Sequence, residues 1–355
     1  MKVLQLTPSL LVGDAIGNDV VAIRKILEEE GYETDIYCYY MDPRLPKDLA
    51  KPMDLLPDLN EDDILLYHAC TDSPMTYQLP GLKGKKVLIY HNITPPSFFG
   101  QYSKEVEGIQ ARALEGMRFL SDKVDCCIAD SEFNRSDLIR FGFHCPIDVC
   151  PIIIPFEDYR QPPDQEIISR YKGDGWTNML FVGRIAPNKK QEDIIRAFYC
   201  YQRDFNPQSR LILIGSSNGM ELYRSRLELF IKKLDISDKV ILPGHVRFSE
   251  ILGFFSLADV FVCQSEHEGF CVPLIEAMLF RIPIVAYNCT AIPETLGSGG
   301  LLLSEKDPLL TAASVHRIVS DASLREYLVR QQQVTLSRFG YDKVRERFLE
   351  CLRNV

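Results

Sequence analysis

Two successive series of alternating strands and helices determine what this chain of 355 residues can fold into. In the first series, apolar runs such as Lys2–Leu6 and Val124–Ala129 indicate buried strands, and the segment Val20–Glu30 has helical periodicity. A polar stretch rich in Pro, residues 155–174, interrupts the pattern, which restarts at Met179–Val182. Such alternation is typical of parallel sheets covered by helices. The sequence therefore predicts two doubly wound α/β domains.

Composition and charge narrow the functional classes. Apolar residues make up 46% of the chain and charged residues 25%, as in ordinary globular proteins. The net charge of -9 argues against a nucleic-acid partner. The 11 cysteines follow no metal-binding spacing and indicate a reducing, cytoplasmic setting. We expect no signal peptide, because the first apolar stretch already ends at Asp14, and no apolar run is long enough to cross a membrane.

The stretch Ser265–Phe280, S-E-H-E-G-F-C-V-P-L-I-E-A-M-L-F, has the features of an anion site. It follows the apolar run Val260–Cys263 and starts a helix in which Pro273 suits the first position. The first amides of a helix have no internal partner, so they attract phosphate. The amides predicted to bind it belong to Gly269, Phe270, Cys271 and Val272.

Two carboxylates flank these amides. Glu268 precedes the turn and Glu276 lies about one turn into the helix. Carboxylates accept hydrogen bonds from sugar hydroxyls, so the combination suits a nucleotide sugar. A Glu early in a helix also has a simpler explanation, because it interacts favourably with the helix dipole.

A basic loop follows the strand Met179–Val182. It contains Arg184, Lys189 and Lys190 and leads into a helix at about Glu192. Arg binds two phosphate oxygens at once and Lys supplies a point charge, so the loop could hold a diphosphate. The alternative is a solvated basic loop without a ligand.

The sequence E-H-E-G-F-C-V-P-L-I-E-A-M resembles the E-x7-E signature of the retaining GT-B glycosyltransferases of family 4, also called group 1. The resemblance implies that Glu268 contacts the transferred sugar and Glu276 the nucleotide ribose. It implies that Arg184 and Lys189 grip the diphosphate, with Lys190 as a one-residue alternative. Cys271 departs from the family, which usually has Gly at that position.

Two further segments resemble the same family. Gly13 and Gly17 are predicted to lie in the loop after the first strand, either as turn residues or, as the resemblance implies, facing the donor phosphates and the acceptor. The turn containing His245 and Val246 is expected to lie against the base.

Two histidines end predicted strands, where α/β sheets bind ligands. We interpret His68 as a structural group. His91 begins H-N-I-T-P-P, which resembles the segment that holds the family's His beside the donor sugar.

The predicted architecture is α/β, GT-B, with two doubly wound Rossmann-like domains facing a cleft. Residues 1–160 form the acceptor-side domain, and residues 161–337 bind the nucleotide sugar. The C-terminal helix, residues 338–355, is expected from the resemblance to complete the first domain. Its apolar face contains Val344, Phe348, Leu349 and Leu352.

The resemblance implies transfer of a hexose from a nucleotide diphosphate sugar to a hydroxyl of a carbohydrate or lipid-linked glycan, with retention at the anomeric carbon. GDP-mannose is favoured and UDP-sugars stay open. No metal or other cofactor is expected. Peripheral contact with the inner membrane face and the oligomeric state are left open. The alternatives are another GT-B enzyme, such as a sugar-nucleotide epimerase, or a non-catalytic nucleotide-sugar-binding scaffold. The residues expected to act in catalysis are His91, Arg184, Lys189 and Glu268.

Overall fold

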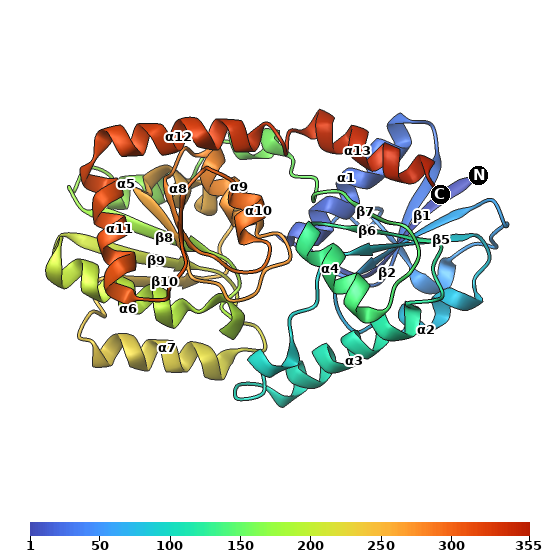
Figure 1. The fold of residues 1–355 in the computed structure, drawn as a ribbon, viewed down its shortest axis with the longest axis horizontal. Coiled ribbons are helices and arrows are strands. Elements are labelled where there is room, and N and C mark those ends of the chain that lie inside the picture. Colours follow the sequence, from blue (N-terminus) through green and yellow to red (C-terminus); the bar gives the residue numbers. More distant parts are fainter. The chain divides into compact units, whose positions relative to one another are not determined.

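The computed structural model describes all 355 residues, which form two compact units (Figure 1). The first unit comprises Met1–Pro96, Glu107–Pro155 and Phe339–Val355, and the second comprises Ser97–Val106 and Phe156–Arg338. The change of unit at Pro155 and Phe156 lies slightly before the boundary that the sequence placed between residues 160 and 161.

The first unit contains a parallel sheet of seven strands in the order β3-β2-β1-β4-β5-β6-β7. The strands are β1 (Lys2–Leu10), β2 (Glu33–Met41), β3 (Lys51–Pro52), β4 (Ile64–Ala69), β5 (Lys85–Tyr90), β6 (Cys126–Ala129) and β7 (Ile147–Val149). The helices are α1 (Ala15–Glu29), α2 (Met75–Gln78), α3 (Lys104–Leu120), α4 (Glu132–Phe141) and α13 (Tyr341–Arg353). Short 3-10 helices span Met53–Leu55, Leu79–Gly81 and Pro96–Phe98.

Successive residues of a strand point to opposite faces of the sheet, so the strands of this sheet contribute side chains to two separate apolar cores. On β1, Val3 packs with residues of α1 and α13, whereas Leu4 and Leu6 pack with residues of α2, α3 and α4. Figure 1 shows α1 and α13 on one side of the sheet and α2, α3 and α4 on the other. The apolar face predicted for the C-terminal helix is confirmed, because its four predicted residues are buried in the first of these cores.

The second unit contains a parallel sheet of six strands in the order β10-β9-β8-β11-β12-β13. The strands are β8 (Thr177–Val182), β9 (Ser209–Ile214), β10 (Val240–Gly244), β11 (Val260–Cys263), β12 (Ile284–Tyr287) and β13 (Leu301–Leu303). The helices are α5 (Gln165–Tyr171), α6 (Gln191–Asp204), α7 (Glu221–Lys233), α8 (Phe248–Leu257), α9 (Val272–Leu279), α10 (Ile292–Leu296), α11 (Pro308–Ser320) and α12 (Ala322–Leu336). Short 3-10 helices span Phe156–Arg160 and Pro187–Lys189. None of the chain's helices has the length and apolar character needed to cross a membrane.

The segment Ser97–Val106 belongs to the second unit although its flanking residues belong to the first. Aromatic contacts attach it there: the ring centroids of Phe98 and His267 are 6.2 Å apart, and those of Tyr102 and Tyr223 are 5.0 Å apart. The guanidinium of Arg226 lies 5.1 Å from the centroid of the Tyr102 ring. The sequence had not indicated this excursion.

The prediction that Gly17 lies in a loop is wrong. Helix α1 begins at Ala15, and the carboxylate of Asp14 accepts a hydrogen bond of 3.2 Å from the amide of Gly17. Asp14 is therefore the N-cap, and the glycine fills the first turn. Only Gly13, with φ +74°, lies in the loop between β1 and α1.

We predict that Gly215 cannot be replaced without loss of stability. An added Cβ would lie 2.0 Å from the carbonyl oxygen of Gly183, which is fixed backbone at the end of the neighbouring strand. Gly215→Ala should destabilise the second unit by about 3 kcal/mol or more. Thermal unfolding measures this, with Gly108→Ala in α3 as control, where helix propensity predicts a gain of about 0.5–1 kcal/mol. Equal melting temperatures for the Gly215→Ala variant and the wild type would contradict the prediction.

Candidate functional site

Two loops of the second unit lie where the strand order reverses. The chain runs from β8 to β9 and β10 on one side, and then returns to β11, β12 and β13 on the other. In open α/β sheets, ligands bind at the carboxyl ends of the strands at this switch point. The loop after β8 is the predicted basic loop, and the loop after β11 contains Glu268. Because β8 and β11 are adjacent, the basic loop and the loop that contains Glu268 lie side by side, although the sequence predicted them separately.

A buried ion pair joins these loops. Lys189 Nζ lies 2.6 Å from Glu268 Oε2, and the two side chains are 21% and 7% exposed. Burial lowers the pKa of Lys189, but the charge and hydrogen bond of Glu268, together with the nearby Cys271 and Cys263, outweigh that effect and raise the pKa. Lys189 is therefore held as a cation against a buried carboxylate.

Asn188 reinforces the connection through its main chain and side chain. Its Nδ2 donates to the carbonyl oxygen of His267 at 3.1 Å, and its own carbonyl oxygen accepts from the amide of Glu266 at 2.8 Å. Asn188 is 5% exposed. Satisfied buried polar groups of this kind fix loop geometry.

The other two basic residues of the loop have different surroundings. Lys190 has φ +53°, and its Nζ lies 3.3 Å from a carboxylate oxygen of Glu266 and 3.8 Å from one of Glu192. Arg184 is exposed, and its Nη2 donates to the carbonyl oxygen of Asn218 at 3.0 Å. Of the two adjacent lysines, only Lys189 forms an ion pair with the carboxylate of Glu268.

In the turn before α9, a cysteine has a backbone conformation that is usually found at glycine. Cys271 is the N-cap of α9 and has φ +74° and ψ +61°. This left-handed conformation is uncommon for residues with a Cβ. Helix α9 begins at Val272, so Pro273 is its second residue rather than the predicted first.

Hydroxyl groups from the segment after β12 hold this turn. The amide of Glu268 donates to Thr290 Oγ1 at 2.9 Å, and Thr295 Oγ1 donates to the carbonyl oxygen of Phe270 at 2.5 Å. Sequence reasoning missed both threonines, because neither Thr290 in its loop nor Thr295 in α10 carries a local signal of a distant partner.

Glu276 lies on α9 with a partner that the sequence did not indicate. Tyr159 Oη donates to Glu276 Oε1 at 2.7 Å. Burial raises the pKa of Glu276 from 4.5 to about 7, and the hydrogen bond from Tyr159 opposes this effect. Tyr159 therefore occupies one oxygen of the Glu276 carboxylate, and the other oxygen is left for a further donor.

Glu276 predicts a specific pH dependence of stability. Its pKa is higher in the folded than in the unfolded state, so the folded state binds the extra proton between about pH 4.5 and 7. Its contribution to stability is present below this window and is lost as pH rises through it. Glu276→Gln removes the titration, so its melting temperature should rise relative to the wild type from about pH 5 to pH 8.

Thermal unfolding across this pH range tests the prediction, with Glu228→Gln as the matched control on the exposed face of α7. A difference between Glu276→Gln and the wild type that does not change with pH would contradict it.

In the first unit, His91 belongs to a buried chain of hydrogen bonds. His91 Nε2 lies 2.9 Å from His68 Nδ1, and His68 Nε2 lies 3.0 Å from Gln5 Oε1. His91 Nδ1 lies 3.0 Å from Asp130 Oδ2. The side chain of His91 is 0% exposed, and His68 is buried completely, as expected of a structural group.

The amide of Gln5 fixes the protons in this chain. Gln5 Nε2 donates to the carbonyl oxygen of Val20 at 3.0 Å, so its Oε1 accepts from His68 Nε2. Burial lowers the pKa of His68 well below its usual value, so this ring is neutral and its Nδ1 accepts from His91 Nε2. The remaining proton lies between His91 Nδ1 and Asp130.

Both ring nitrogens of His91 are therefore used inside the unit. Burial lowers the pKa of His91, but the charge and hydrogen bond of Asp130, together with the charges of Asp19 and Asp14, outweigh this effect and raise it. Contact of His91 with a sugar stays a prediction, and it requires the ring to exchange one of these bonds. Asp19 also lies close enough to form a metal-type cluster with both histidines, but the facing ring nitrogens already bond to each other.

We predict that Asp130 holds His91 in its doubly protonated form. In Asp130→Asn the new amide donates to His91 Nδ1, so the hydrogen bonds persist while the ring becomes neutral. Nitrogen NMR of the histidine rings near pH 7 measures this change, with Glu132→Gln as the exposed control on α4. A neutral His91 ring in the wild type would show the prediction to be wrong.

Two of the predicted site residues lie in turns with few contacts. Gly13 is exposed in the loop between β1 and α1, and Val246 is partly exposed between β10 and α8. The predicted roles of Gly13 at the phosphates and Val246 at the base stay predictions.

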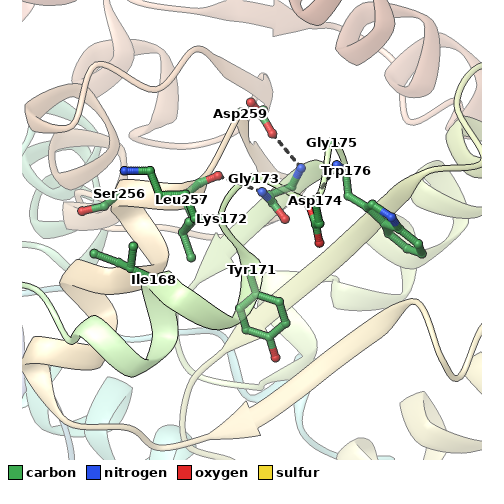
Figure 2. Close-up of a pocket in the computed structure, with 11 residues that line it drawn as sticks. Ile168, Tyr171, Lys172, Gly173, Asp174, Gly175, Trp176, Ser256, Leu257 and Asp259 are labelled. Carbon is green, nitrogen blue, oxygen red and sulfur yellow. Dashed lines mark hydrogen bonds between the residues drawn. The ribbon is translucent and has the colours of Figure 1, made fainter.

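A pocket of about 330 Å³ lies elsewhere in the second unit (Figure 2). Its lining includes Gly173, Asp174 and Trp176, which precede β8, and Asp259, which precedes β11. These residues mark the amino ends of the strands, the opposite edge from Lys189 and Glu268. The pocket is therefore separate from the switch-point site.

Comparison with known proteins gives similarity to glycosyltransferases. Residues 169–334 match the family model of the glycosyl transferases group 1. O-antigen chain mannosyltransferase B of Escherichia coli is 25% identical over 232 residues, which cover 62% of this chain and 58% of that protein. The GDP-mannose-dependent alpha-(1-6)-phosphatidylinositol monomannoside mannosyltransferase of Mycobacterium tuberculosis is 24% identical over 240 residues, covering 64% and 59%. The matches span less than two thirds of either relative.

Among solved structures, Anabaena HepE in complex with UDP-glucose has a TM-score of 0.79 at 17% identity, with 100% of both chains covered. Similarity at this level of identity concerns the fold. It confirms the expected α/β architecture of two Rossmann-like GT-B domains.

Proposed function

Because residues 169–334 match the family model of the glycosyl transferases group 1, we propose that the chain transfers a hexose from a nucleoside diphosphate sugar to an acceptor hydroxyl. The acceptor is a carbohydrate or a lipid-linked glycan in polysaccharide or glycan biosynthesis, and the anomeric configuration is retained. The buried pair of Lys189 and Glu268 at the switch point supports this assignment most directly.

The reaction needs negative charge on the departing diphosphate to be stabilised. Arg184 is exposed and Lys189 is cationic, and both lie in the loop after β8. The amides at the start of α9 add partial positive charge at the neighbouring strand. Preorganised donors of this kind can stabilise a leaving group without a metal ion, and the proposed mechanism assigns no step to one.

Donor binding exchanges one ion pair for another. Without the donor, Lys189 and Glu268 neutralise each other at 2.6 Å. The diphosphate attracts Lys189, and the carboxylate of Glu268 is then released to accept hydrogen bonds from the transferred sugar. The cost of separating the pair is offset only when both parts of the donor are present, so a nucleotide sugar is favoured over either fragment.

The remaining assignments follow from the family resemblance, residue by residue. Glu276 accepts from the ribose through the oxygen that Tyr159 leaves available. Val246 contacts the base through its backbone. His91 acts on the sugar once its ring exchanges one of its two hydrogen bonds, and Asp130 positions the ring.

GDP-mannose is the donor that we favour, because one relative is described as GDP-mannose-dependent and another as a mannosyltransferase. A UDP-sugar is the alternative, because the HepE structure contains UDP-glucose. Thermal stabilisation by a panel of nucleoside diphosphates and their sugars distinguishes the two bases. A ligand at 100 times its dissociation constant should add about 2.7 kcal/mol of stability.

Glu276→Ala should weaken binding of the stabilising nucleotide by about 10- to 100-fold, since it removes one charged hydrogen bond. Arg184→Ala should have a similar effect on the diphosphate, and Arg203→Ala on the exposed end of α6 is the matched control. No stabilisation by any nucleotide, or equal affinity in Glu276→Ala, would overturn the donor site.

Product analysis then separates the remaining classes. Transfer to an added glycan acceptor supports the proposed enzyme. Conversion of the free nucleotide sugar without an acceptor would indicate an epimerase, and binding without any turnover would indicate a scaffold.

A further inference from the structure

Two thiols and a carboxylate meet beneath the turn that precedes α9. Cys263 ends β11, Cys271 is the N-cap of α9, and Glu268 lies between them in sequence. One oxygen of Glu268 and the two sulfur atoms all lie within 4.8 Å of one another. The three residues are 0%, 7% and 7% exposed, in the order Cys263, Glu268, Cys271.

The cluster depends on a cysteine in an unusual backbone conformation. Cys271 has φ +74°, which typically costs a residue with a Cβ about 1–3 kcal/mol. Such a conformation persists only where the surroundings impose it. Here Thr290 binds the amide of Glu268 and Thr295 binds the carbonyl oxygen of Phe270. The sulfur of Cys271 is therefore held near Cys263 by the fold of the turn.

Two thiolates and a carboxylate are the ligands that zinc prefers, and sulfur selects soft cations over Mg²⁺ or Ca²⁺. Charge also balances. A divalent cation with two thiolates and one carboxylate has a net charge of minus one, and Lys189, 2.6 Å from Glu268, neutralises it. Binding forms two metal–sulfur bonds and one metal–oxygen bond, and the two thiol protons pass to solvent without any redox change.

We propose that Cys263, Glu268 and Cys271 form a binding site for a soft divalent cation such as Zn²⁺. A cation bound there occupies the carboxylate that the proposed function gives to the transferred sugar. It therefore inhibits donor binding. This last consequence rests on the proposed function, whereas binding of the cation does not.

The test uses the full chain, treated with a chelator and kept in a non-thiol reductant. Co²⁺ is added as a spectroscopic substitute for zinc, and absorption from thiolate-to-cobalt charge transfer is recorded. We expect one Co²⁺ per chain, displaced by Zn²⁺. Cys263→Ala and Cys271→Gly should each lose the band. Their loss of Zn²⁺ affinity should exceed the about 10- to 100-fold that follows removal of a partner outside the ligand set.

Cys289→Ala is the matched control. Cys289 is a partly buried thiol of the same unit whose Sγ donates to the carbonyl oxygen of Glu266 at 2.8 Å, and it is not part of the cluster. This variant should keep the band. Cys271→Gly is expected to fold, because glycine accepts φ +74° without strain. Its melting temperature verifies that loss of the band is not loss of structure.

Absence of the band in the wild type, its persistence in folded Cys271→Gly, or its loss in the control would overturn the cation site. Competition with the donor separates this proposal from the function. If Zn²⁺ binds through the cysteines and a stabilising nucleotide sugar does not weaken it, the cation site stands and the role of Glu268 in donor binding fails. If a nucleotide sugar binds and no cation does, the donor site stands and the cation site fails.

Discussion

The buried ion pair between Lys189 and Glu268 is the interaction on which the second unit's site depends. It joins the loops after the adjacent strands β8 and β11, where the strand order reverses. A buried pair contributes little net stability, but loss of one partner leaves an uncompensated charge that typically costs about 3–5 kcal/mol. The two residues are therefore constrained together. A ligand can separate them only if it supplies a replacement for each.

The local signals in the sequence were sufficient for most elements. Helix α4 (Glu132–Phe141) illustrates such signals, because the hydroxyl of Ser131 caps its start and Gly142, in a left-handed conformation, ends it. Gly17 was misplaced because the capping role of Asp14, three residues earlier, was overlooked. Strand β3, Lys51–Pro52, was missed because two exposed residues pair through their backbone with Tyr37 and Cys38 and show no side-chain pattern.

The site shows a similar division. The positions of Lys189, Glu268 and Glu276 after their strands could be predicted, since strand ends and helix starts have local signatures. Their partners could not. Tyr159 is 117 residues from Glu276, and Asp130 is 39 residues from His91. Nothing in the sequence around these residues indicates such contacts, because the order of strands in a sheet decides which loops meet. For the same reason, the sequence could not show that both ring nitrogens of His91 already have hydrogen-bond partners.

The division of the chain between units has a consequence for biosynthesis. The face of the first sheet that α1 and α13 cover receives Val344, Phe348 and Leu352 from a segment that is translated after the entire second unit. While the ribosome makes residues 156–338, part of that apolar face has no cover. Domains commonly fold in order of synthesis, and uncovered sheets are exposed to aggregation meanwhile. Here the unit that begins first is finished last, so the first sheet gains its full apolar cover only after α13 emerges.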